Sequence, residues 1–363
     1  MKNTVEVLES NQIVFPRLGI DIHLDSTAFT LFGIDIQWYG ILITLGMVLA
    51  MIYAFRRMPS YGISPDRAID GVLAGIIGAI IGARAYYVIL EWDNYAGDWK
   101  SIFNLRQGGL AIYGGLIGAL LVGCTVAKLR KVRLLPLLDL VGTGFLLGQG
   151  IGRWGNFFNQ EAFGKNTDNV FGMSGGQIQS WIQNSYPSSN FYENFEAPMD
   201  AFQTVHPCFL YESIWCLIGF FVLAVVSKKW RKFDGQIFLM YIGWYGFGRF
   251  FIEGLRVDSL VIGNIRISQM VAAMCVIISV ILLIVQGNRV KRLGDDYKLY
   301  KDTEESKQLL AESFKAKKEK KSNDSDVEIS ELEKDEKISD KTEEKLPAED
   351  AEQIQEEENG KAN

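Results

Sequence analysis

Three arginines follow glycine-rich stretches near the ends of long apolar runs. They are Arg84 in the stretch GARAYY, Arg153 in GIGRWG and Arg249 in GFGRFF. An ionisable side chain inside an apolar segment is costly and usually faces a cavity or a partner. A guanidinium group stays charged and matches a phosphate with two parallel hydrogen bonds. The set is therefore a candidate site for an anionic lipid headgroup, although each arginine alone could extend to the membrane surface without a function.

Carboxylates lie close in sequence to these arginines. Glu253 follows Arg249 by four residues and precedes Arg256 by three. A continuous helix would place these three side chains on one face, where the carboxylate could pair with a guanidinium group. Glu212 lies at the beginning of another apolar run. Pairs of this kind would hold the guanidinium groups in fixed positions.

Seven apolar windows are long enough to cross a bilayer, which takes roughly 20 helical residues each. The sequence therefore predicts an all-α, polytopic membrane protein with seven transmembrane helices. A soluble globular domain and a disulfide scaffold are both disfavoured. The windows are about 38–55, 68–90, 109–127, 134–152, 208–227, 235–252 and 267–286.

The distribution of Lys and Arg predicts the orientation of the helices. The connections 56–67, 128–133 and 228–234 hold 11 basic residues in 25 positions, whereas the other connections hold 8 in 124. Cytoplasmic connections carry the excess of Lys and Arg, so we expect the dense set in the cytoplasm. The N-terminus is then outside and the C-terminus is cytoplasmic. On this topology Arg84, Arg153 and Arg249 lie at similar depth, within the outer leaflet.

Charge and composition divide the chain into three predicted parts. The net charge is −6, and residues 287–363 alone hold 16 basic and 23 acidic residues. We predict an external N-terminal segment over 1–37, a seven-helix catalytic domain over 38–290 with an external head loop over 165–207, and a charged cytoplasmic tail over 291–363. The tail is expected to be disordered or to form a solvated helix. The four cysteines form no CxxC pair. We expect neither a metal site nor a redox motif.

Small residues and two aspartates have simpler interpretations. Glycine pairs four residues apart let helices approach closely. Asp70 and Asp139, near the cytoplasmic ends of their windows, are expected to cap or pair locally. The glycine pairs are Gly71/Gly75, Gly78/Gly82, Gly144/Gly148 and Gly148/Gly152.

One segment resembles the signature of a known enzyme family. Residues 152–164 read GRWGNFFNQEAFG, which is similar to the pattern GR-x-GNF-x-N-x-E-xx-G of bacterial prolipoprotein diacylglyceryl transferases. Further segments match in order, and the resemblance covers about residues 30 to 290. These segments are Trp38-Tyr39-Gly40, Gly82-Ala83-Arg84, Gly114 to Gly118, His206-Pro207 with Leu210-Tyr211-Glu212, and Arg249-Phe250 through Glu253 and Arg256.

The resemblance implies a reaction. Members of this family transfer the diacylglyceryl group of phosphatidylglycerol to the lipobox cysteine thiol of prolipoproteins, which forms a thioether and releases glycerol 1-phosphate in the first step of lipoprotein maturation. Negative charge grows on the departing phosphate oxygen, and fixed guanidinium groups would stabilise it. We expect Arg153 and Arg249 to bind the phosphate, with Arg256 and Arg84 in support.

This chain departs from the family pattern at the positions where relatives have a candidate base for the thiol proton. An unperturbed Cys has a pKa near 8.5, and the thiolate is the nucleophile. Many members have His directly before the Gly-Gly of the third helix, where this chain has Tyr113. Some have His beside the Trp-Tyr of the first helix, where this chain has Gln37. Tyr113 could relay a proton, and His206 is a candidate base, although it could instead position the His-Pro turn.

The remaining expectations concern the substrates and the cell. Tyr39, Asn156, Glu161 and Tyr245 are expected to hold the glycerol headgroup or to line the cavity, and Glu161 could orient Arg153 instead. The expected partners are phosphatidylglycerol, prolipoprotein signal peptides and membrane lipids, with no cofactor, metal or nucleic acid. The expected location is the bacterial cytoplasmic membrane.

Two other classes of protein share some of these features. Transporters and lipid scramblases also contain intramembrane arginines and broken glycine-rich helices. The recurring Gly-x-Arg endings hint at an internal repeat of that kind, but the segments otherwise differ. A membrane scaffold would suit the charge-rich tail. Thiol-dependent release of glycerol phosphate would distinguish the enzyme from both.

Overall fold

The computed structural model describes residues 4–97, 99–104, 108–185, 199–257, 259, 261–262 and 265–316. The chain divides into two units, Met1–Lys307 and Gln308–Asn363. In the second unit the described residues 308–316 are helical. The candidate site lies in the first unit.

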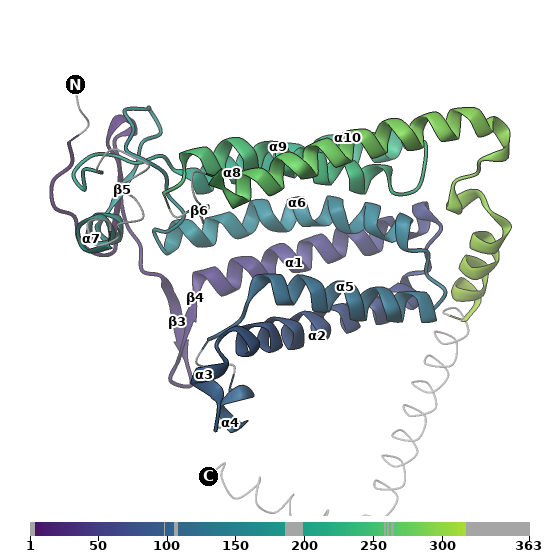
Figure 1. The fold of residues 1–363 in the computed structure, drawn as a ribbon, viewed down its shortest axis with the longest axis horizontal. Helices are drawn as coiled ribbons and strands as arrows, with labels where there is room; N and C mark the ends of the chain where they lie inside the picture. Colours follow the sequence, from purple (N-terminus) through teal and green to yellow (C-terminus); the bar gives the residue numbers. More distant parts are fainter. Residues whose placement is uncertain are drawn as a thin grey trace, which may run out of the picture. The chain divides into compact units, whose positions relative to one another are not determined.

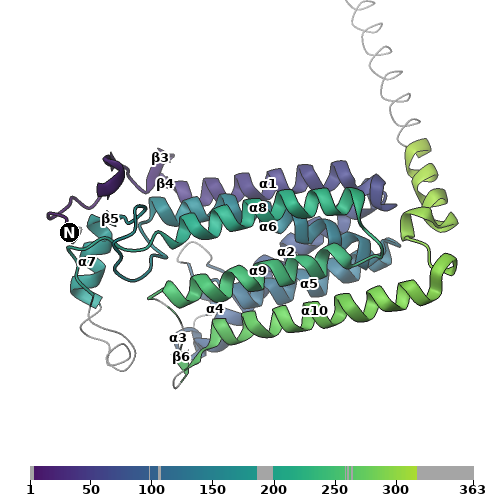
Figure 2. The same cartoon turned by 90° about the horizontal axis from the view of Figure 1, so that it is seen from above.

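Long helices running side by side form the body of the first unit (Figure 1). Figure 2 shows the same helices from above. Among the described residues, six of them are long and apolar enough to cross a membrane, which confirms the predicted helical membrane architecture. The helix α9 carries Arg249 and Glu253, is not among these six, and packs against α6, α8 and α10. The count of seven spans and their orientation therefore stay predictions. The long helices are α1 (Trp38–Arg57), α2 (Pro65–Leu90), α5 (Ile112–Leu129), α6 (Leu134–Phe158), α8 (Cys208–Lys229), α9 (Gln236–Leu255) and α10 (Ile267–Leu293).

Glycines bring two pairs of helices into close contact, as predicted. A Cβ atom on Gly78 of α2 would lie 2.6 Å from the carbonyl oxygen of Gly118 on α5. A Cβ atom on Gly46 of α1 would lie 3.0 Å from the carbonyl oxygen of Gly148 on α6. A side chain at Gly78 would force the backbone to shift and one at Gly46 would be tightly crowded, so the glycines let the helix backbones come into close contact.

A small head of strands and one helix lies at one end of the long helices (Figure 1). Strand β1 (Gln12–Phe15) pairs antiparallel with β2 (Ile20–His23) and with β5 (Ser174–Gly175), and α7 (Gly176–Ser185) follows. Phe157 of α6 and Phe209 of α8 belong to the same buried cluster as Ile13 and Ile178 of the head. This shared core fixes the ends of α6 and α8 beneath the head. Further strands are β3 (Thr27–Leu31), β4 (Ile34–Gln37), β6 (Val261–Ile262) and β7 (Ile265–Arg266), and the short helices are η1 (Pro16–Leu18), η2 (Met58–Tyr61), α3 (Trp92–Tyr95), α4 (Trp99–Ile102), η4 (Gly294–Asp296) and η5 (Tyr300–Asp302).

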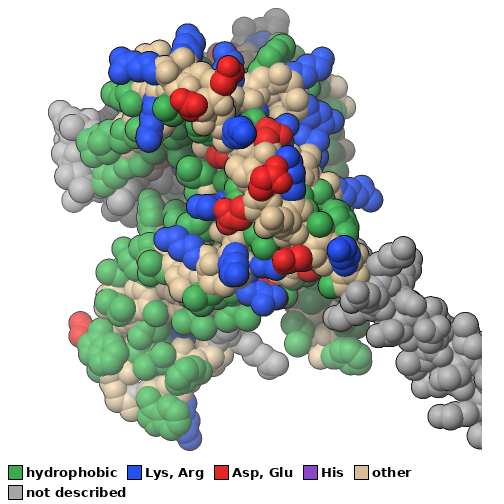
Figure 3. All heavy atoms as spheres, turned by 90° about the vertical axis from the view of Figure 1, so that its right-hand side faces the viewer, with side chains coloured by type: hydrophobic (Ala, Val, Ile, Leu, Met, Phe, Trp, Pro, Cys, Tyr) green, Lys and Arg blue, Asp and Glu red, His purple; other side chains and the backbone are tan. Residues whose placement is uncertain are grey.

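The opposite end of the long helices is rich in Lys and Arg (Figure 3). The two predicted aspartate contacts lie toward this end. Asp70 pairs with Arg130 at 2.6 Å. Asp139 accepts hydrogen bonds from the backbone N–H groups of Gly235 and Phe238 and so anchors the beginning of α9. Both aspartates have the local structural role that we expected.

The first part of the tail is folded, unlike our expectation of disorder from residue 291 onward. Tyr300 is buried, and its backbone N–H donates to Asp234 over 2.9 Å. The Ser306 hydroxyl donates to the Gly62 carbonyl oxygen over 2.9 Å. These contacts hold residues 294–307, which we call the C-terminal strap, against the connections before α2 and α9. Net charge alone does not reveal such specific contacts, which is why composition suggested disorder. Residues 317–363 lie outside the described part of the chain.

Candidate active site

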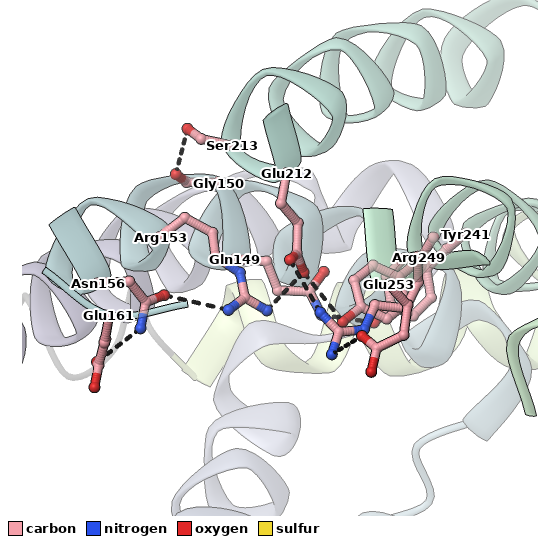
Figure 4. A network of polar contacts seen from close by, with 11 residues as sticks. Gln149, Gly150, Arg153, Asn156, Glu161, Glu212, Ser213, Tyr241, Arg249 and Glu253 are labelled. Carbon is pink, nitrogen blue, oxygen red and sulfur yellow. Dashed lines mark hydrogen bonds and ion pairs between the residues drawn. The ribbon is translucent and has the colours of Figure 1, made fainter. Parts of the chain in front are cut away.

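A buried carboxylate joins two of the predicted arginines near the head. Glu212, in the first turns of α8, accepts from Nη2 of Arg153 over 2.6 Å and from Nη1 of Arg249 over 3.2 Å. The three side chains come from α8, α6 and α9 and point toward one another (Figure 4). Tertiary packing of three helices therefore gathers charges that lie 59 and 37 residues apart in the sequence.

A second carboxylate supports Arg249 from the same helix. Nη2 of Arg249 lies 2.6 Å from Oε2 of Glu253, one helical turn later on α9. The predicted pairing of these two residues is confirmed. Helix α9 ends at Leu255, and Arg256 has extended backbone that bridges to Gly164. The sequence spacing had suggested that the helix continues and carries Arg256 on the same face. This expectation is wrong, because the helix ends before Arg256.

Arg153 is also held from the other side by the signature segment. Its Nη1 donates to Oδ1 of Asn156 over 3.2 Å, and Nδ2 of Asn156 donates to Oε1 of Glu161 over 2.8 Å. Glu161 thus acts on Arg153 through an amide rather than directly. Tyr39 packs beside Gly155, where a Cβ atom would lie 2.6 Å from its ring. Asn156, Glu161 and Tyr39 therefore cluster around the end of α6.

Exposure differs between the two kinds of charge in this network. The side chains of Arg153 and Arg249 are 23% and 19% exposed, whereas those of Glu212 and Glu253 are 3% and 2% exposed. The carboxylates lie behind the arginines and neutralise them in the absence of another anion. Burying such charges is tolerated only with good geometry and further hydrogen bonds, which Asn156 supplies. The arrangement leaves guanidinium N–H groups accessible to a ligand that carries negative charge.

Glu212 is the residue of this network that our sequence reasoning ranked too low. We named it as a nearby carboxylate and placed it in a matching segment, but not among the site residues. A signal was present, because Glu212 is the single acidic residue between Cys208 and Lys229. A buried charge in such a run needs a partner. Tyr245, which we predicted as a site residue, lies beside Glu212, with its hydroxyl 3.4 Å from Oε1 of Glu212.

The structure places Arg84 differently from our expectation. Its guanidinium group is buried and donates to backbone carbonyl groups of α4 and of the chain between α4 and α5, over distances of 2.7 to 3.1 Å. It therefore holds this connection in place and does not join Arg153 and Arg249. The accepting carbonyl groups belong to Ser101, Ile102, Asn104, Gly108 and Gly109.

Neither candidate for the proton acceptor belongs to the ion-pair network of the described residues, although His206 lies only six residues before Glu212. Tyr113, in the first turn of α5, is 70% exposed. His206 lies just before α8, and its Nδ1 is 3.2 Å from the Tyr211 hydroxyl. Partial burial, and secondarily the charge of Lys165, lower the pKa of His206. An uncharged imidazole can accept a proton, so its protonation state suits a base.

Apolar helices, together with partly exposed arginines that pair with buried carboxylates, define a helical membrane protein with a candidate site for an anionic group. The model of the prolipoprotein diacylglyceryl transferase family matches residues 26–285. The chain belongs to this family, and it is a multi-pass membrane protein.

Curated relatives cover most of the chain and nearly all of their own length. A phosphatidylglycerol–prolipoprotein diacylglyceryl transferase of Finegoldia magna is 42% identical over 72% of this chain and 95% of its own. The protein of the same name from Clostridium novyi is 41% identical over the same shares. That of Bacillus cereus is 41% identical over 78% of this chain and 99% of its own. The resemblance seen in the sequence is confirmed.

Proposed function

We propose that this chain transfers the diacylglyceryl group of phosphatidylglycerol to the lipobox cysteine of prolipoproteins. Its relatives bear the name of this activity. The observation that carries the proposal is the pair of arginines, Arg153 and Arg249, which one buried carboxylate joins and whose side chains stay 23% and 19% exposed. A phosphodiester is the anion that such a pair matches.

The proposed reaction is a displacement at carbon. The cysteine sulfur attacks the glycerol carbon of the lipid that bears the phosphate oxygen. A carbon–sulfur bond forms and the carbon–oxygen bond breaks, so that the electron pair leaves with glycerol 1-phosphate. Arg153 and Arg249 bind the phosphate and stabilise the charge that grows on its oxygen. Because Glu212 holds both guanidinium groups in advance, little reorganisation is needed when the charge develops.

Other residues of the site have supporting roles in this proposal. Asn156, Glu161, Tyr39 and Tyr245 bind the glycerol headgroup or line the cavity. Arg256 supports the phosphate site from the end of α9. We assign Arg84 to the connection that it holds rather than to the phosphate.

The thiol proton goes to a base, for which His206 and Tyr113 are the candidates. Partial burial lowers the pKa of His206, which favours the neutral imidazole that a base needs but also weakens that imidazole as a proton acceptor. Tyr113 occupies the position where many relatives have His, and a phenol accepts a proton poorly unless it is ionised.

The orientation completes the proposal. The Lys- and Arg-rich end faces the cytoplasm, and the head faces outward from the bacterial cytoplasmic membrane. The lipid and the signal-peptide helix enter sideways between helices. The transfer reaction then occurs near the outer leaflet. The lipobox cysteine, at the end of the signal peptide, lies at this depth.

Purified protein, phosphatidylglycerol vesicles and a lipobox peptide test the proposal. Mass spectrometry should show one diacylglyceryl group on the peptide cysteine, with glycerol phosphate released only when the thiol is present. Arg153→Ala and Arg249→Ala should each abolish transfer while the protein still inserts. Near-normal transfer by both variants would overturn the assignment, and glycerol phosphate release without thiol would favour another activity.

A further inference from the structure

One polar pair beside the ion-pair network is not explained by a phosphate site. Gln149 lies one turn before Arg153 on α6, and Tyr241 lies one turn before Tyr245 on α9. Nε2 of Gln149 donates to the Tyr241 hydroxyl over 3.3 Å. Oε1 of Gln149 is buried and has no hydrogen-bond partner among the described residues. Figure 4 shows the two side chains together with the ion-pair network, within the same group of helices.

An unpartnered amide atom in this place is unfavourable for folding. The neighbouring turn of α6 shows that an apolar residue packs well here, because Leu146 is fully buried against α8 and α9. Packing of α6 therefore does not require a glutamine. The polar side chain indicates a hydrogen-bonding group that comes from outside the chain.

The pair offers a donor in either orientation of the amide. As observed, Gln149 donates to Tyr241, and the hydroxyl proton of Tyr241 remains available. If the amide turns over, Tyr241 donates to Oε1 and the two hydrogens on Nε2 remain available. In the first case Oε1 stays unpartnered beside such a group. A group that only accepts hydrogen bonds satisfies the whole pair in the second case, where Oε1 accepts from Tyr241 and Nε2 donates to the ligand.

Depth along the helices identifies such a group. Gln149 precedes Arg153 by four residues and Tyr241 precedes Arg249 by eight, which is roughly 6 and 12 Å of helical rise toward the basic end. The acyl chains of a lipid whose phosphate lies on the arginines must extend into the hydrocarbon, away from the head. The glycerol carbons and the ester carbonyl groups come next in that direction. An ester carbonyl oxygen accepts hydrogen bonds and cannot donate them.

We propose that Gln149 and Tyr241 bind an ester carbonyl group of the diacylglyceryl donor. This inference rests on the proposed function and names a second point of contact on the same lipid. Together with the arginines, the pair fixes the glycerol carbon between two anchors, so that the carbon under attack faces the thiol. The enzyme should accordingly distinguish ester-linked from ether-linked lipids.

Two donor lipids test this inference. Phosphatidylglycerol with two ether-linked chains keeps the phosphate and the leaving group but lacks the carbonyl oxygens. The unaltered protein should show a kcat/KM about threefold to tenfold higher with the diester than with the diether lipid, the range expected for one hydrogen bond. In Tyr241→Phe and Gln149→Leu the diester value should fall to the diether value, which itself stays unchanged.

Thr143→Val is the matched control, because Thr143 is a buried polar residue of α6 that donates to the Asp139 carbonyl within its own helix. It should keep the preference for the diester lipid. Equal losses with both lipids in the Gln149 and Tyr241 variants would show a structural role and overturn the inference. So would an absent preference in the unaltered protein. Failure of the proposed function looks different, since the unaltered protein would then transfer neither lipid, and the inference would fall with it.

Discussion

At the scale of single residues, Glu212 determines how the two arginines of the candidate site are placed. One buried carboxylate sets the separation of two guanidinium groups that come from different helices. An arginine pair without this carboxylate would repel and separate, because like charges in a medium of low dielectric interact strongly. The positions of the proposed phosphate-binding groups therefore depend on a residue that need not touch the phosphate.

Glu212→Gln should lower transfer strongly. The change removes the charge and leaves Arg153 and Arg249 without their common partner, so we expect kcat/KM to fall about 100-fold, as for the loss of one preorganised charge-stabilising group. Steady-state transfer assays in vesicles measure this. Asp70→Asn is the control, because it breaks an exposed pair with Arg130 and should change little. Equal effects of the two changes would contradict a special role for Glu212.

The pH dependence of transfer tests His206. Its pKa is lowered by burial, so the neutral form is favoured in the folded protein. Protonation therefore costs stability, and this cost develops as the pH falls below the unfolded value of about 6.5. If His206 accepts the thiol proton, kcat/KM falls on the acid side and His206→Gln removes that limb. A rate profile that is the same in both proteins would exclude His206 as the base.

At the scale of elements, the packing of α2 against α5 positions the connection that Arg84 holds. Backbone contacts at Gly78 and Gly118 replace side-chain packing along this pair. Arg84 then binds carbonyl groups of the chain that leads into α5. The pair of helices α2 and α5 packs against the remaining helices through the buried cluster that contains Met58, Tyr61, Ala127 and Leu140.

Gly78→Leu should destabilise the protein. The added side chain would meet the Gly118 carbonyl and Val122, so we expect a loss of about 1–3 kcal/mol from overpacking. Thermal unfolding in detergent measures the change. Gly287→Leu on α10 is the matched control, because a Cβ atom there meets nothing within 4 Å and should leave the midpoint nearly unchanged. A larger loss from Gly287→Leu would contradict the assigned helix contacts.

At the scale of the whole molecule, the first unit has distinct ends. The head shares one buried core with α6 and α8, whereas the C-terminal strap packs at the Lys- and Arg-rich end. Asp234 accepts from the backbone N–H of Tyr300, and its own N–H donates to the Tyr297 hydroxyl. The strap therefore ties α10 to the connection between α8 and α9.

Two truncations distinguish the strap from the chain that follows it. Ending the chain after Lys307 keeps every contact described for the strap and should leave stability and transfer unchanged. Ending it after Leu293 removes the buried Tyr300 and the Ser306–Gly62 bond. We expect Tm to fall by several degrees, at about 2–4 °C for each kcal/mol lost. Equal melting temperatures for the two truncations would show that the strap contributes nothing.

Several features of the fold and site could be predicted from local sequence. The length of the apolar segments predicted the long helices, and the four-residue spacing of Arg249 and Glu253 predicted their ion pair. Both depend only on helical geometry, which repeats along the chain. Arg84 shows the limit, because its Gly-x-Arg context matches that of Arg153 and yet it binds backbone carbonyl groups of a neighbouring connection. Local context does not reveal which groups a folded connection will present.

The sequence by itself determined the helical membrane architecture, the family and the arginines that can bind an anion, because hydropathy, residue type and spacing are local properties. Only the tertiary structure decided that Glu212 joins Arg153 to Arg249, that Arg84 does not join them, and that residues 294–307 fold against the first unit. These outcomes depend on which helix faces meet. The packing of many residues that lie far apart in the chain decides which faces of the helices are in contact.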